Sequence, residues 1–181
     1  MRFQFAIQLT DEEYFAINKF LMLQSRNGKK KMLIFRISLA VALCAIAFLS
    51  LLGGGFTAAA WRGIIPYFIL LALFQAGIRP FFLWIIKGNI RSLGKQGKMP
   101  YSPTSDMTFG EESFTETTPD NKTEVKYTAI DNVSAIPDQA IYIHINSLLH
   151  YIIPVSVFAS RQEYEDFLSF LETKCEKVER Y

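Results

Sequence analysis

The chain has 181 residues, half of them hydrophobic, and a formal net charge of +2 that hides a strong asymmetry. Residues 1–31 carry a net charge of +3, residues 32–103 carry +7 without any acidic side chain, and residues 104–181 carry −8. The acidic C-terminal part argues against a nucleic-acid-binding domain, since phosphate backbones require clustered Lys and Arg. Two cysteines, Cys44 and Cys175, make no disulfide framework and suit a reducing cytoplasm.

The N-terminal segment, residues 1–31, predicts one strand and one helix. Apolar and polar residues alternate over residues 2–9, which indicates a half-buried strand. Thr10 and Glu13 have the spacing of a capping box, and an amphipathic helix is expected from there to about Ser25. This helix is expected to lie either on the membrane surface or on the C-terminal domain.

Residues 32–86 predict a transmembrane hairpin with spans at 32–52 and 64–86. Both apolar runs reach the length of about 20 helical residues that a hydrocarbon core of about 30 Å requires. Insertion of the second run is favoured by about 6 kcal/mol, against a cost of about 3 kcal/mol for Arg79. A buried hairpin in a soluble protein is the less favoured alternative, because soluble core helices rarely lack a polar face. A cleaved signal peptide is disfavoured by the long polar segment before the first run.

Basic residues at the ends of the hairpin predict its orientation. They precede the first span and follow the second, at Arg26, Lys29, Lys30, Lys31, Lys87, Arg91, Lys95 and Lys98. The expected loop, residues 53–63, contains a single basic residue, Arg62. The positive-inside rule therefore predicts a multi-pass protein of the cell (inner) membrane with both termini in the cytoplasm. The clustered charge also predicts that the lipid bilayer, with its anionic lipids, is a partner.

After a basic linker at 87–103, residues 104–181 predict a small β domain. Short alternating runs separated by turn residues indicate an antiparallel meander or a small barrel. Ser160 and Glu163 form a second expected capping box. The apolar positions that follow, as far as Cys175 and Val178, predict an amphipathic helix packed on the sheet.

The C-terminal part resembles the YcxB-like family of bacterial membrane proteins. The resemblance is carried by Ile152-Ile153-Pro154, by Val157-Phe158, by the helix start Ser160–Phe167, and by the acidic helix start after residue 9. It implies a membrane α+β fold in the bacterial plasma membrane, in which a two-helix transmembrane hairpin carries a small antiparallel, pleckstrin-homology-like β domain closed by a C-terminal amphipathic helix. This chain has Val155 where the family has a basic residue, which puts any ligand of that residue in doubt. The resemblance implies no activity.

The sequence predicts no catalytic site, metal site or cofactor. The histidines, His144 and His150, are expected to face solvent, and no third metal ligand is spaced near them. Arg36 and Arg79 are the candidate lipid or interaction residues, since no acidic residue between 32 and 103 is present to pair with them. Arg36 is expected to snorkel. Arg79 is expected either to snorkel or to bind a lipid phosphate or a carbonyl at a kink made by Pro80.

Two functions fit these features. The first is a non-enzymatic, membrane-anchored module that presents its cytoplasmic β domain for interaction with lipid headgroups or with an unknown protein partner. The alternative is a membrane-embedded protective, immunity or regulatory factor that acts through the hairpin. A membrane enzyme would need clustered polar residues at the membrane face, where the sequence offers only Gln75 and Arg79.

Overall fold

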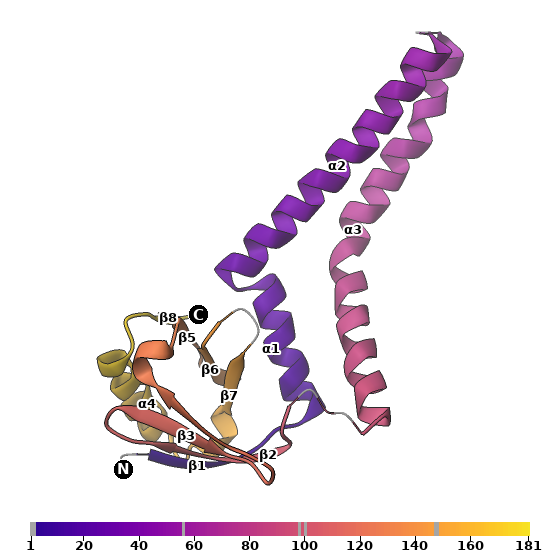
Figure 1. Cartoon of the computed structure of the whole chain (residues 1–181). Helices are drawn as coiled ribbons and strands as arrows, with labels where there is room; N and C mark the ends of the chain where they lie inside the picture. The colour runs from indigo at the N-terminus through magenta and orange to yellow at the C-terminus, as the bar shows by residue number, and fades with distance from the viewer. Residues whose placement is uncertain (1–2, 56, 98, 100, 147–148) are drawn as a thin grey trace. The chain divides into compact units, whose positions relative to one another are not determined.

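The computed structural model of the chain describes residues 3–55, 57–97, 99, 101–146 and 149–181 (Figure 1). The chain divides into two compact units, and each is taken by itself. The β domain comprises Met1–Ile17 and Ser92–Tyr181, and the hairpin unit comprises Asn18–Arg91. The β domain is therefore built from both ends of the sequence, with the hairpin unit inserted between them.

The first sheet joins the N-terminal strand to the C-terminal part of the chain. Its strands are antiparallel in the order β1-β2-β3-β4. They span Phe3–Gln8, Thr104–Phe109, Ser113–Thr117 and Lys122–Lys126. The strand predicted at residues 2–9 is confirmed, but its alternation could not reveal its partner, because period two reports burial and not pairing. The predicted boundaries of 1–31 and 104–181 thus divide a single sheet.

The second sheet has the order β7-β6-β5-β8. Its strands span Asn132–Ile136 (β5), Ala140–His144 (β6), His150–Pro154 (β7) and Val178–Arg180 (β8). Three strands form the predicted antiparallel meander, and β8 pairs with β5 in parallel. The predicted continuation of the last helix to Val178 is wrong. Cys175 caps that helix in an extended conformation, and the chain then pairs with the free edge of β5.

Helix α4, Arg161–Lys174, closes the core of the β domain. Phe167 is fully buried, and its ring lies 5.0 Å from that of Phe5 on β1 and 4.8 Å from that of Phe109 on β2. The capping box predicted at its start is formed, since Ser160 Oγ accepts from the Glu163 N–H at 3.1 Å. The Glu163 carboxylate in turn accepts from the Ala159 N–H at 2.6 Å, one residue before the box predicts.

The hairpin helices are longer than the apolar runs. Helix α2 spans Arg26–Gly54 and α3 spans Ala58–Lys95. The predicted loop at 53–63 is therefore mostly helical, and most of the predicted linker at 87–103 belongs to α3. Alanine and basic residues in these stretches are good helix formers, so the helices continue where hydrophobicity ends. Phe56 of the predicted loop and the basic Lys98 lie outside the described residues.

Both helices are long and apolar enough to cross a membrane. Their most apolar windows are only 11% and 6% buried, whereas the core helix of a soluble protein would be mostly buried. Nearly all large apolar side chains that are exposed among the described residues lie on α2 and α3. The helices therefore present to their surroundings the kind of surface that hydrocarbon, and not water, would cover.

The two chain segments that flank the hairpin unit are tied together within the β domain. Helix α1, Asp11–Leu23, begins at the predicted capping box, in which Thr10 Oγ1 accepts from the Glu13 N–H at 3.2 Å. Tyr101, just before β2, donates its hydroxyl to Asp11 at 2.8 Å, and its ring stacks on Tyr14 at 4.8 Å. Burial and this carboxylate raise the pKa of Tyr101 to about 12. The chain segment that precedes the hairpin and the segment that follows it therefore meet in one small cluster of Asp11, Tyr14 and Tyr101.

Candidate functional site

The corner between α1 and α2 holds two backbones in close contact. Ser25 Oγ donates to the Leu21 carbonyl at 2.6 Å and accepts from the Gly28 N–H at 3.0 Å. A Cβ added at Gly28 would lie 1.9 Å from the Leu21 carbonyl oxygen, so only glycine fits there. This corner brings Met22 and Leu23, at the end of α1, next to the first turns of α2.

Arg36 on α2 is fixed by Gln75 on α3. The Arg36 Nε–H donates to Gln75 Oε1 at 2.6 Å, and Gln75 Nε2 donates back to the Arg36 carbonyl at 3.2 Å. An amide group on the neighbouring helix therefore holds the Arg36 side chain, and the sequence had assigned no such partner to it. Among the described residues, the two Nη groups of Arg36 have no acceptor and stay available for a ligand.

Arg36 and Arg79 line the same pocket, although the two residues are far apart in sequence. This corner pocket has a volume of about 250 Å³ and is lined by Met22, Leu23, Lys29, Met32, Leu33, Arg36 and Arg79. Three of its seven lining residues are cationic and none is acidic. Within the described part of the chain, neither the Lys29 ammonium nor the Arg79 guanidinium has a hydrogen-bond or ion-pair partner. Because unpaired cations in a partly apolar setting favour an anion, the pocket is suited to a negatively charged group.

Pro80 lies inside α3, and the helix continues on both sides of it. Proline donates no N–H to the carbonyl four residues earlier, that of Ala76. The sequence predicted Arg79 and Pro80 as a possible binding point, and the structure places Arg79 at the pocket wall. Lys29 was predicted only as interfacial charge, and Gln75 only as a polar residue in a span. Their positions depend on helix register, which no local pattern specifies.

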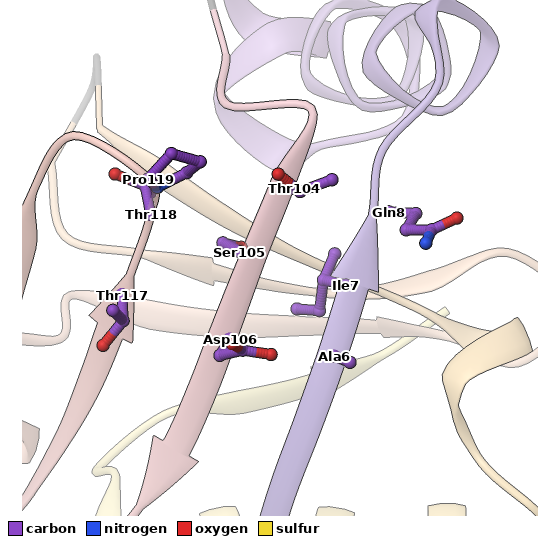
Figure 2. Close-up of a pocket in the computed structure, with 9 residues that line it drawn as sticks. All are labelled: Ala6, Ile7, Gln8, Thr104, Ser105, Asp106, Thr117, Thr118 and Pro119. Carbon is purple, nitrogen blue, oxygen red and sulfur yellow. The ribbon is translucent and has the colours of Figure 1, made fainter.

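A second pocket lies at one end of the first sheet and differs in chemistry. It has a volume of about 360 Å³, and Figure 2 shows its lining from β1, β2, the end of β3 and the chain that follows β3. The lining residues are Ala6, Ile7, Gln8, Thr104, Ser105, Asp106, Thr117, Thr118 and Pro119. Most are neutral, Asp106 is the one charged residue among them, and no basic residue is present. This pocket would therefore repel an anion.

His144 is not where the sequence placed it. His144, expected to face solvent, is 5% exposed, and its Nδ1 lies 2.9 Å from His150 Nδ1. Its Nε2 lies 3.1 Å from the hydroxyl of Ser134, which is 1% exposed. The error comes from assuming one solvated face for each strand, whereas β6 is buried on both faces. Burial, and then the charge of His150, lower the pKa of His144 to about 4, so its ring is neutral at pH 7.

This Ser-His-His chain has the spacing of a hydroxyl nucleophile beside its base. Catalysis would also require that a substrate reach the hydroxyl oxygen. Ser134 is buried in the middle of β5, flanked in the sheet by β6 and β8. The three residues therefore form a hydrogen-bonded polar network in which Ser134 and His144 are buried and His150 is half-buried.

The fold and the corner pocket define a class of protein. It has a small two-sheet domain interrupted in sequence by a pair of candidate membrane-spanning helices, and a cationic pocket lined by the end of α1 and by residues of α2 and α3. The family model described as YcxB-like protein matches residues 109–171. That segment runs from the end of β2 into α4, so the resemblance to the YcxB-like family is confirmed over most of the two sheets. No curated protein and no solved structure matches the chain.

Proposed function

We propose that this is a non-enzymatic two-pass protein of the bacterial plasma membrane. It holds a cytoplasmic, pleckstrin-homology-like β domain against the membrane and binds the headgroup of an anionic lipid in the corner pocket. The observation that carries the proposal is the convergence of Lys29, Arg36 and Arg79 on one pocket without an acidic lining residue. Proteins that bind anionic headgroups use such basic pockets on the cytoplasmic side of their spans.

Strand pairing supports a two-pass arrangement. β1 precedes the hairpin unit and pairs along its whole length with β2, which follows it, from Phe3↔Phe109 to Gln8↔Thr104. Both flanks of the hairpin must then lie on the same side of a membrane, and only an even number of crossings allows this. Basic residues at the ends of both helices favour the cytoplasmic side.

The order of elements supports a pleckstrin-homology-like domain. The first four strands make one antiparallel sheet, the next three make a second, and α4 follows and fills the core. In this chain the first loop of such a domain would contain the entire hairpin. The burial of Ser134 and His144 supports a non-enzymatic role, because the nucleophile-like pair is closed to substrate.

Lipid retention tests the proposal. The full chain is extracted from native membranes in mild detergent, and the phospholipid that co-purifies with it is measured per protein. We expect Arg79→Gln to lower this amount at least several-fold, because a hydrogen bond to a charged group contributes about 1.5–3 kcal/mol. Lys87→Gln is the matched control, since Lys87 is exposed on the same helix but does not line the pocket.

Equal retention by Arg79→Gln, Lys87→Gln and the parent chain would refute the lipid site. If Arg79→Gln kept its lipid and yet lost a cellular phenotype, the result would favour the alternative, a protective or regulatory factor acting through the hairpin. An adverse effect of Lys87→Gln equal to that of Arg79→Gln would point to general surface charge and not to the pocket.

A further inference from the structure

The side chains that line the corner pocket offer hydrogen-bond donors but no oxygen or nitrogen acceptor. Its polar lining consists of one ammonium group and two guanidinium groups, and the other four lining residues are Met or Leu. Lys and Arg donate and do not accept. Glycerol, inositol and ethanolamine headgroups carry O–H or N–H groups that need acceptors, and the ammonium of ethanolamine would also meet three positive charges. A group that only accepts fits this lining best.

The size and the apolar wall of the pocket limit the ligand further. A volume of about 250 Å³ is below the range of about 300–1,000 Å³ that is typical of sites for drug-sized ligands. Met22, Leu23, Met32 and Leu33 lie beside the cations and are suited to hydrocarbon. The lining therefore suits a ligand that joins a small, highly charged terminal group to an apolar lipid body, with no further polar headgroup.

We propose that the corner pocket selects a membrane lipid that ends in a phosphate monoester, with Lys29, Arg36 and Arg79 donating to its three terminal oxygens. This inference rests on the proposed function and names the headgroup that the function leaves open. The apolar wall favours a lipid over free phosphate. Gln75 is a positioning residue, since it holds the Arg36 side chain through Nε and leaves both Nη groups to face the ligand.

Such a ligand gives the site a characteristic pH dependence. A phosphate monoester carries a charge of about −1.5 to −2 at pH 7 and loses part of it below its second pKa of about 6, whereas a phosphodiester stays at −1. The charged groups facing the pocket are Lys29 and Arg36 on α2 and Arg79 on α3, and the α1 residues that line it are apolar. A change in binding between pH 5 and pH 8 would therefore report the second ionisation of the phosphate on the ligand.

The test uses the full chain in detergent micelles and native mass spectrometry to count bound lipid. Phosphatidic acid, phosphatidylglycerol and inorganic phosphate are added separately at equal concentration. We expect phosphatidic acid to bind at least tenfold more tightly than phosphatidylglycerol at pH 7.5, with a smaller preference at pH 5, and inorganic phosphate not to be retained. Arg79→Gln and Lys29→Gln should each remove the preference, and Lys30→Gln, at an exposed neighbouring position that does not line the pocket, should keep it.

Equal binding of the two lipids that still depends on Arg79 would overturn the monoester preference and leave the proposed function standing. Binding of both lipids without dependence on Arg79 would overturn both proposals. Retention of inorganic phosphate as strong as that of phosphatidic acid would show a soluble-anion site, and a preference unchanged at pH 5 would show that the second charge is not recognised. Either result would refute the inference.

Discussion

His144 is a buried base whose protonation opposes folding. Its pKa falls from an ordinary value of 6.5 to about 4 because of burial and the neighbouring His150. A lowered folded-state pKa means that the unfolded chain binds the proton more tightly. The stabilisation is therefore complete above pH 6.5 and is lost as the pH falls towards 4. From the size of this shift, the loss for this one group is about 3 kcal/mol.

We expect the unfolding midpoint of the full chain in micelles to fall more steeply between pH 7 and pH 4.5 than that of His144→Gln. Glutamine does not titrate, and its amide can still bond with Ser134. Carboxylates that protonate over the same range contribute equally to both proteins and cancel in the comparison. Identical pH dependence of the parent and the variant would show that His144 is not the titrating group.

At the scale of single residues, the sequence predicted which charged residues matter better than it predicted the partners of those residues. Arg36 and Arg79 stood out because no carboxylate occurs nearby in the sequence. Gln75, which holds Arg36 at 2.6 Å, could not be assigned as its partner, because the pairing depends on how two helices are rotated against each other. The prediction for His144 was wrong for a related reason: burial of the second face of a sheet depends on what packs against it.

The α1–α2 corner depends on a single glycine. In most helices Gly→Ala stabilises by about 1 kcal/mol, because alanine loses less backbone entropy. At Gly28 an added Cβ would meet the Leu21 carbonyl oxygen at 1.9 Å and the Met22 carbonyl oxygen at 2.7 Å, and backbone atoms cannot move aside cheaply. We expect Gly28→Ala to lower the unfolding midpoint, to speed tryptic cleavage near Arg26 and to weaken lipid retention, with a cost of about 1–3 kcal/mol.

Gly77→Ala is the matched control. Gly77 lies inside α3, and a Cβ added there would have no neighbouring atom within 4 Å, so the same substitution should be neutral or stabilising. If Gly28→Ala were as stable as Gly77→Ala, the corner would not be the tight contact that the structure shows.

At the scale of elements, the starts of α1 and α4 were predictable, whereas the partners of the strands were not. At both capping boxes the cap hydroxyl, of Thr10 or Ser160, accepts from the N–H three residues on, as the spacing predicts. These signals are local, because cap and partner are three residues apart. The pairing of β8 with β5 and of β1 with β2 joins distant segments, and no local spacing encodes it. The family resemblance predicted a small antiparallel β domain and its closing helix, but not that β1 belongs to that domain.

At the scale of the whole molecule, the hairpin lies in sequence between β1 and β2, so the orientation of the protein in a membrane has only two possible values. If α2 and α3 cross a membrane, both flanks of the hairpin lie on the same side of it in either orientation. Cys175 is a poor reporter of that side, because it is 8% exposed and burial raises the pKa of its thiol to about 11. Thiolates are the reactive form, so labelling at Cys175 would be slow from either side.

Two engineered cysteines in a Cys44→Ala background give a direct test. Asp120→Cys lies in the exposed turn between β3 and β4, and Ala59→Cys lies in the exposed first turn of α3. A membrane-impermeant maleimide should label Ala59→Cys in intact cells and Asp120→Cys only in inside-out vesicles. The reverse pattern would overturn the orientation that the basic residues predict. Labelling of both positions from the same side would show that α2 and α3 do not cross the membrane, and the exposed apolar surface of these helices would then need a protein partner to cover it.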